Sequence, residues 1–261
     1  MSEPPTNAPG VARLTLAIEL SNPPRQEVAA ESASVAGVAF GRGVAGEPSS
    51  VEVLGVERLA LSRRSDADLS PAVARLAECL EIAPRSIERV AVSVGPGGYT
   101  STRIAVATGA AIALAADAEA VPVPSARVAA ANVGDPGEGF VVALASKRDT
   151  AWINAFDASG RPAPADPASA DGGRLANAGQ LSGWLDALDF APGVLWIDAF
   201  APPGFVEAAA ARAMAVRPPK LDAEGCLRAS VREAGVAPSL LRPLYPREPE
   251  AIRRWRELGR D

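Results

Sequence analysis

The stretch that decides the fold runs from Val90 to Ala116 and reads VAVSVGPGGYTSTRIAVATGAAIALAA. Its first five residues form a nearly continuous apolar run, which is typical of a strand buried on both faces. A loop of glycine and proline, Gly95 to Gly98, ends this strand, and the alanine-rich segment after it predicts a helix over 102–116. A strand, a glycine turn and a helix in this order indicate an α/β fold.

The sequence on either side of this stretch contains a similar pattern twice. Each half opens with two strand-like segments joined by a polar connection, and each continues to a further strand and a helix. The repeat lies in the order of the elements, and it predicts a duplicated α/β architecture. The predicted strands are 14–20, 34–40, 51–62, 90–94, 140–145, 151–156 and 194–200, and the predicted helices are 70–80, 102–116, 205–216 and 249–258.

The composition favours a globular protein of the cytoplasm. The chain has 261 residues, of which 48% are apolar and 22% charged, so that an ordinary core can form. Its longest run of small and apolar residues, 104–116, is shorter than the roughly 20 residues that cross a bilayer, so we expect no membrane contact. The net charge of −5 argues against a protein that binds nucleic acid by itself.

The absence of histidine from the sequence excludes several classes of enzyme. Histidine is the commonest metal ligand and the usual general base near neutral pH. Without it, the chain cannot form a His-based zinc or iron site, a Ser-His-Asp triad or a Cys-His dyad. Any catalysis would have to rest on carboxylates, lysine or the backbone, which excludes most hydrolase designs but not every enzyme. We expect no catalytic residues and no metal site in this chain, and no activity of the chain alone.

The segment GPGGYTSTRI resembles the signature GPGSFTGLRIG of the TsaB family, with matches at Gly95, Pro96, Gly97, Thr100, Arg103 and Ile104. Three further segments resemble family segments: VPVPS at 121–125, FVVALASKRDTAWINAFDASG at 140–160 and RPLYPREPEA at 242–251. The resemblance therefore touches both halves of the chain and its tail.

This resemblance implies an actin/Hsp70/sugar-kinase-like (ASKHA) fold of two related, ribonuclease-H-like subdomains. We expect residues 1–120 plus 238–261, with a C-terminal helix, to form the first and residues 121–237 the second. The family implies a non-catalytic subunit of the complex that makes N6-threonylcarbamoyladenosine in tRNA, next to the anticodon. Its partners would be a catalytic TsaD-like paralogue and, through the complex, a TsaE-like ATPase and tRNA. A homodimer is an alternative assembly.

The glycine loop is a candidate anion or nucleotide site formed by Gly95, Gly97, Gly98 and Thr100. Backbone N–H groups at the start of a helix can bind an anion. The loop is no Walker A motif, because no lysine follows it and Pro96 has no N–H. The alternative interpretation is a tight turn between strand and helix, with Thr100 or Ser101 as N-cap.

ATPases of the expected fold carry an Asp at the end of the first strand of each half, and this chain departs from that pattern. Glu19 stands at the first position and Ala145 at the second. We therefore expect no cofactor bound by this chain alone, with ATP and Mg²⁺ left to the assembled complex. The alternative is a small ATPase or kinase that uses Glu19 and Asp149 as metal ligands.

The helix over 102–116 is predicted to contact a partner, because it is apolar on all sides and one sheet can cover only one face. The alternative is an internal helix covered by the chain's own elements. The family resemblance favours the partner interface, with the helix over 69–80 beside it. The predicted interface residues on the two helices are Leu69, Val73, Leu76, Arg103, Ala107, Ala110, Ala111 and Leu114.

Overall fold

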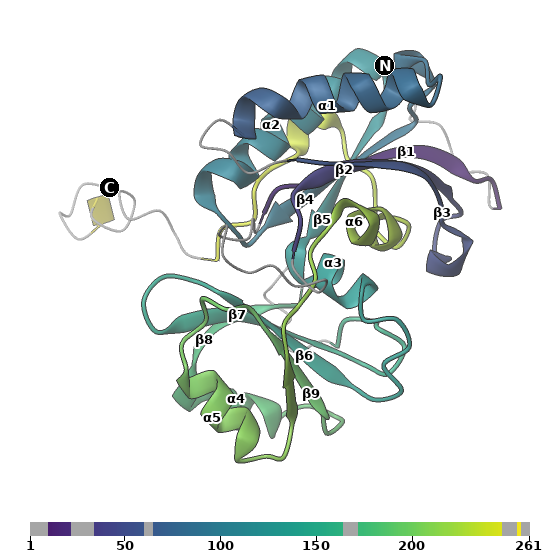
Figure 1. Ribbon diagram of the computed structural model, residues 1–261. Helices are drawn as coiled ribbons and strands as arrows, with labels where there is room; N and C mark the ends of the chain where they lie inside the picture. The colour runs from purple at the N-terminus through teal and green to yellow at the C-terminus, as the bar shows by residue number, and fades with distance from the viewer. Residues whose placement is uncertain (1–9, 22–33, 60–64, 164–171, 247–254, 257–261) are drawn as a thin grey trace.

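Two mixed five-stranded sheets form the framework of the chain (Figure 1). The computed structural model describes residues 10–21, 34–59, 65–163, 172–246 and 255–256. In the first sheet, of order β3-β2-β1-β4-β5, strands β1, β2 and β3 are antiparallel neighbours, and β4 and β5 run parallel to β1. Its strands are β1 (Arg13–Glu19), β2 (Gly37–Gly43), β3 (Glu52–Arg58), β4 (Arg89–Gly95) and β5 (Glu119–Pro124).

The second sheet repeats the first, strand for strand. Its order is β10-β9-β6-β7-β8, again with three antiparallel neighbours followed by two strands parallel to the first. Its strands are β6 (Phe140–Ala145), β7 (Thr150–Phe156), β8 (Arg174–Asn177), β9 (Val194–Ile197) and β10 (Ala215–Arg217). The predicted duplication and the ASKHA fold class are therefore confirmed.

Helices cover both faces of each sheet, so the molecule has alternating helical and sheet layers (Figure 1). Helices α1 and α2 cover the outer face of the first sheet, α3 and α6 lie between the sheets, and α4 and α5 cover the outer face of the second. The helices are α1 (Ser65–Cys79), α2 (Tyr99–Ala116), α3 (Ser125–Ala131), α4 (Ala178–Leu185), α5 (Gly204–Ala210) and α6 (Ala223–Ser230). Short 3₁₀ turns are η1 (Pro48–Ser50), η2 (Pro84–Ser86) and η3 (Pro238–Leu240). Within the described ranges, no helix is long and apolar enough to cross a membrane.

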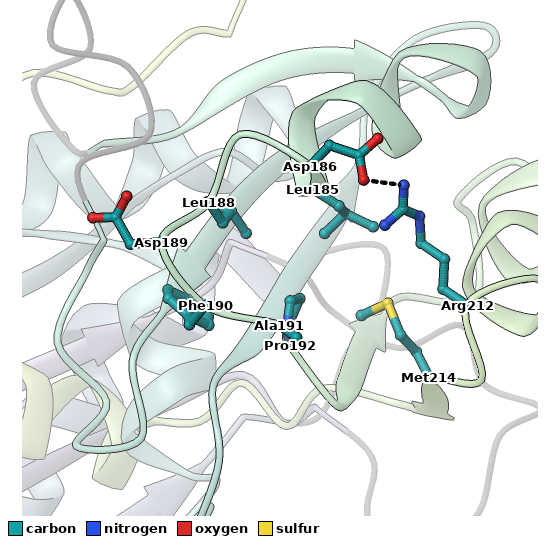
Figure 2. A pocket seen from close by; sticks show the side chains of 9 residues that line it. All are labelled: Leu185, Asp186, Leu188, Asp189, Phe190, Ala191, Pro192, Arg212 and Met214. Atoms are coloured by element: carbon teal, nitrogen blue, oxygen red, sulfur yellow. Dashed lines mark hydrogen bonds and ion pairs between the residues drawn. The ribbon is translucent and has the colours of Figure 1, made fainter.

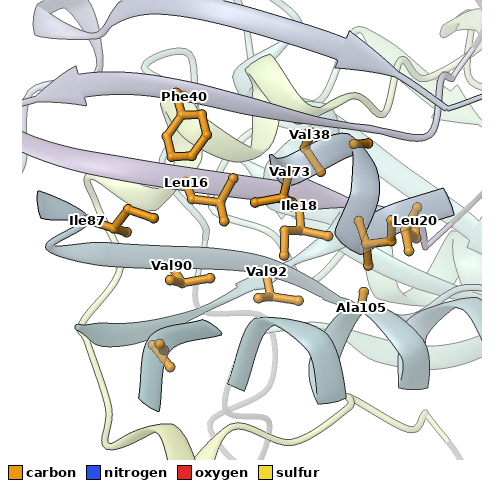
Figure 3. Close-up of a cluster of buried hydrophobic side chains, with 14 of the residues drawn as sticks. Leu16, Ile18, Leu20, Val38, Phe40, Val73, Ile87, Val90, Val92 and Ala105 are labelled. Atoms are coloured by element: carbon orange, nitrogen blue, oxygen red, sulfur yellow. The ribbon is translucent and has the colours of Figure 1, made fainter. Parts of the chain in front are cut away.

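Large aliphatic side chains fill the space between the first sheet and its outer helices (Figure 3). Leu16 and Ile18 of β1 lie in this cluster with Val92 of β4, and all three are fully buried. Helix α2 lies so close to β4 that a side chain at Gly109 would overlap Val92. Glycine therefore permits this close approach of helix and strand.

The opposite face of the first sheet carries small residues and meets the middle helical layer. Ala17, Ala39 and Ala91 are fully buried there, in one cluster with side chains of α3, α6 and the second sheet. A side chain at Gly41 would overlap Leu227 of α6. Because successive residues of a strand point to opposite faces, the large and small residues alternate along β1.

Two predicted helix starts are wrong. Helix α1 begins at Ser65 and not at Ser70, so that Pro71 lies inside it. The fully buried Leu69 anchors the earlier turn in the core, and this packing outweighs the preference of proline for the first helical position. Helix α2 begins at Tyr99 instead of Thr102. Of the predicted terminal helix 249–258, only Trp255 and Arg256 are described, both as helix, and the remainder lies outside the described residues.

The division into subdomains 1–120 plus 238–261 and 121–237 stays a prediction. Two elements near its boundaries have their contacts in the first sheet. Strand β5 pairs with β4, and α6 packs on β1 and β2. Any division of the chain has to account for these two contacts.

A pair of glycine substitutions tests the close packing of α2. We expect Gly109→Ala to destabilise the fold by about 1–3 kcal/mol, because the added methyl group overlaps Val92 in a filled core. Gly183 of α4 is exposed with open space around it, so Gly183→Ala should stabilise the fold by up to about 1 kcal/mol through helix propensity. Urea unfolding of both variants measures the difference, and stabilisation by Gly109→Ala would contradict the packing.

Candidate functional site

Four buried polar side chains meet at the carboxyl ends of β1, β4 and β5. Glu19 ends β1, Ser21 follows it, Ser93 lies on β4, and Ser125 begins α3 directly after β5. The three serines are fully buried and Glu19 is 1% exposed. In α/β folds, ligands bind at the carboxyl ends of the strands, so this is the position at which a site is expected.

The four side chains form one chain of hydrogen bonds. Ser21 donates to Oε1 of Glu19 from both its backbone N–H and its hydroxyl, at 2.5 Å each. Ser93 Oγ lies 3.3 Å from Ser21 Oγ and 3.0 Å from Ser125 Oγ. The other carboxyl oxygen of Glu19, Oε2, is buried and has no hydrogen-bond partner among the described residues. This end of the sheet is thus filled by the chain's own polar groups.

Burial is the largest influence on the pKa values of Glu19 and of the nearby Cys226. It raises the pKa of Glu19 above its ordinary value of 4.5, against the hydrogen bonds from Ser21 and Ser93, which lower it. The negative charge of Asp222 raises the pKa further. Burial also raises the pKa of the Cys226 thiol, whose Sγ lies 3.7 Å from the carbonyl oxygen of Ile18. Both groups therefore favour their neutral, protonated forms.

The glycine loop predicted to hold an anion packs directly against Ser21. The N–H of Gly98 donates to the carbonyl oxygen of Ser21 at 2.6 Å, and a side chain at Gly97 would overlap that residue. Gly95 has φ of 102°, a conformation that favours glycine. The amide of Gly98 is therefore occupied within the chain. The binding of an anion or nucleotide by this loop stays a prediction.

The N-cap of α2 differs from the expected one. Gly98 occupies the cap position without a side-chain hydrogen bond, and Thr100 and Ser101 lie in the first turn. The hydroxyl of Ser101 donates to the carbonyl oxygen of Gly98 at 3.1 Å. Glycine is tolerated at the N-cap position that Gly98 occupies. At the preceding residue, Gly97, the tight contact with Ser21 leaves no room for a larger side chain.

In the second half, the carboxylate at the corresponding edge comes from a residue that the sequence analysis missed. Ala145 ends β6, as predicted, and its N–H donates to Oδ2 of Asp198 at 2.7 Å. Asp198 directly follows β9 and also accepts the N–H of Phe200 at 2.8 Å. An acidic residue directly after a buried strand, in WIDAF, was the signal that could have found it.

The two proposed metal ligands of the ATPase alternative have very different surroundings. Glu19 is 1% exposed, with one oxygen held by Ser21. Asp149 is exposed in the turn between β6 and β7. No group of three or more Asp, Glu, Cys or His side chains suited to a metal ion occurs in the described part of the chain. The arrangement around Glu19 offers an incoming cation no open face.

Helix α2 divides into a buried and an open face. Thr102, Ala105, Gly109 and Ala113 are buried toward β4. The open face carries four of the predicted interface residues, with Ala110 half-buried at its edge. Leu114 is 75% exposed, which is unusual for so large an apolar side chain. The four exposed residues are Arg103, Ala107, Ala111 and Leu114.

The predicted interface is corrected on α1. Leu69, Val73 and Leu76 are buried in the chain's own core, with exposed fractions of 0%, 8% and 7%. Their helical spacing marks the face that α1 turns toward its own sheet, which the pattern alone cannot distinguish from a face turned toward a partner. These three residues are not open to a partner, and the part of the predicted interface on α2 stays a prediction.

A cluster of two tyrosines and an arginine lies at the start of this open face. The guanidinium of Arg103 lies 4.0 Å from the centre of the Tyr99 ring, and its Nε donates to the hydroxyl of Tyr245 at 2.7 Å. The Tyr99 and Tyr245 rings lie 5.8 Å apart. Tyr245 belongs to the segment PLYP near the end of the chain, so the cluster joins that segment to α2. Only Arg103 of this cluster was singled out from the sequence.

A shallow hollow of about 370 Å³ lies beside α4, far along the chain from these residues (Figure 2). Leu185, Phe190 and Met214 contribute its apolar wall. At its rim, Arg212 forms an ion pair with Asp186 at 2.6 Å. Asp189 also lines the hollow, so its charged lining consists of two aspartates and one arginine.

The buried Glu19 predicts a dependence of stability on pH. Below pH 4.5 the carboxyl is protonated in the folded and the unfolded chain and has no effect. As the pH rises above 4.5, the unfolded chain loses this proton while the folded chain retains it, because the folded pKa is raised, and stability falls. Glu19→Gln, which keeps the acceptor oxygen for Ser21, should therefore be more stable than the wild type at pH 7. Urea unfolding should show the difference shrinking toward pH 4.5, and a less stable variant at pH 7 would contradict the raised pKa.

The chain is similar to known proteins in the sequence of one segment and in its fold. The family model described as TsaD, tRNA N6-adenosine threonylcarbamoyltransferase, matches residues 54–160. No curated protein matches the chain in sequence. The matched segment contains β4, the glycine loop and α2, which carried the sequence interpretation.

Solved structures share the fold over most of the chain. An uncharacterized protein from Pseudomonas aeruginosa, described as similar to peptidase YeaZ, has a TM-score of 0.63 at 19% identity, covering 90% of this chain and 100% of its own. YeaZ from the same organism has a TM-score of 0.60 at 20% identity, covering 89% and 99%. The resemblance to a TsaD-related family is thus confirmed. Residues 54–160 match the TsaD family model, and the chain has the fold of the YeaZ structures.

Proposed function

We propose that this chain is a non-catalytic subunit that binds and supports a TsaD-like catalytic paralogue in the synthesis of N6-threonylcarbamoyladenosine in tRNA. The observation that carries the proposal is the open apolar face of α2, formed by Ala107, Ala111 and Leu114. Removing apolar surface from water stabilises an association by roughly 25 cal/mol per Å². Alanines in the middle of this face allow a partner helix to approach closely.

The lack of catalytic groups supports the same proposal. The resemblance implies that the catalytic paralogue holds its metal with a His-x-x-x-His pair, and this sequence contains no histidine. The carboxyl group of Glu19 is closed off by Ser21 at the edge where a nucleotide site of this fold would lie. A protein with these features contributes to the reaction through contact with its partner.

The wider assembly is part of this proposal. A TsaE-like ATPase and tRNA would join through the complex, in the cytoplasm, where tRNA is modified. The net charge of −5 favours a chain that reaches tRNA through its partner instead of by itself. Without its partner, the chain would form a homodimer through the same face of α2, because such interfaces are often self-complementary.

A charged side chain on the open face tests the interface. We expect Ala111→Arg to weaken the heterodimer with the catalytic paralogue of the same organism by on the order of tenfold or more, because an arginine there would be desolvated without a partner charge. Co-expression, pull-down and titration calorimetry measure this loss.

Ala210→Arg is the matched control, because Ala210 is an exposed alanine on α5, in the other half of the chain. It should bind like the wild type. If Ala111→Arg remains folded and still forms the heterodimer with unchanged affinity, α2 is not the interface. If the wild-type chain forms no heterodimer at all, the proposed function itself is wrong.

A further inference from the structure

A second hollow, of about 430 Å³, lies on the flank of the middle helical layer. Residues of α3 and α6 line one side of it, and the turn after β7 lines the other, so both halves of the chain contribute. Its charged lining residues are four arginines and a single glutamate: Arg127, Arg161, Arg228, Arg232 and Glu233. This local excess of positive charge contrasts with the negative charge of the whole chain.

Two of these arginines are held in place by uncharged acceptors. Arg228 donates from Nη2 to Oδ1 of Asn132 at 2.5 Å and from Nε to the carbonyl oxygen of Ala131 at 3.4 Å. Arg232 donates from Nη1 to the carbonyl oxygen of Gly160 at 3.1 Å. These bonds orient the guanidinium groups without neutralising them, so each keeps its full charge.

The third arginine, Arg127, has one charged partner and one unused donor. Its Nη1 lies 2.5 Å from Oε1 of Glu233. Its Nε is buried and has no hydrogen-bond partner within the described part of the chain. A buried donor left unpaired costs free energy.

The turn that carries the fourth arginine is fixed by its own carboxylate. Oδ1 of Asp157 accepts the N–H and the hydroxyl of Ser159 at 2.8 and 2.7 Å, and the N–H of Arg161 at 2.9 Å. The side chain of Arg161 is exposed, and its guanidinium makes no hydrogen bond to another described residue. The turn thus fixes the backbone from which the side chain of Arg161 extends, and this residue lines the hollow.

We propose that this hollow, the arginine hollow, binds a compact anion that carries two or more phosphate groups. Guanidinium groups bind phosphate through paired N–H donors, and several converging arginines favour more than one phosphate. The volume lies in the range of small-molecule sites. A concave site of this size on a chain of net charge −5 fits a small ligand better than a long polyanion. Such a ligand would contact α6 and the β7 turn together and so fix the two halves relative to each other.

The experiment uses inorganic pyrophosphate and the full chain in titration calorimetry at low ionic strength. We expect binding of one pyrophosphate per chain, weakened by added salt. The double variant Arg161→Gln/Arg232→Gln should lower the affinity by on the order of tenfold or more, because it removes two charged donors. Arg212→Gln is the matched control, since it removes one arginine of the second half outside the hollow and should leave the affinity unchanged.

Three outcomes would overturn the proposal. They are no heat of binding with the wild type, equal affinity of the wild type and the double variant, and an equal loss in Arg212→Gln. Arg161→Gln alone covers the case in which the double variant does not fold, and it should lower the affinity in the same direction. If a short RNA displaces pyrophosphate and binds more tightly, the ligand is a nucleic acid and the assignment of a compact anion is wrong. The test requires no catalytic paralogue, so its failure leaves the proposed function standing.

Discussion

The two sheets share one layer of helices, and this layer can exist only because the inner face of the first sheet is made of small residues. Ala17, Ala39 and Ala91 keep that face flat, and α6 comes close enough for the thiol of Cys226 to approach the carbonyl oxygen of Ile18. Larger side chains at these positions would push α6 outward and carry α3 with it, since the two helices pack on each other. The same close approach brings Ser93 and Ser125 together at the edge of the sheet.

The carboxyl edge of β1 and the outer side of α2 differ in where their polar and apolar groups point. At the carboxyl edge of β1, polar groups turn inward, and Ser21 donates two hydrogen bonds to one carboxyl oxygen of Glu19. On the outer side of α2, apolar groups turn outward, with Leu114 the most exposed. This distribution fits the proposed role of a subunit that acts by contact with a partner.

Most of the fold could be predicted from the sequence because its signals are local. The apolar run of β4, the glycine loop and the alanine-rich helix identified the central unit, and the recurrence of strand pairs indicated the duplication. The site was less predictable, because it depends on which face of an element is covered. The spacing of Leu69, Val73 and Leu76 indicates an apolar face without telling what lies against it. Tyr245 became visible only when the fold brought distant segments together, whereas Asp198 had a local signal in its position directly after a strand.

The position of α6 in the chain has a consequence for biosynthesis. The last strand of the first sheet ends at Pro124, but the helix that covers the inner face of this sheet begins at Ala223, after the whole second sheet. A nascent chain leaving the ribosome therefore carries a first sheet whose inner face is uncovered over β1 and β2 while about a hundred further residues are translated. The first half therefore cannot complete its core by itself, because α6 covers part of its inner face and follows the second sheet in the sequence. We therefore infer that the two duplicated halves complete their folding together.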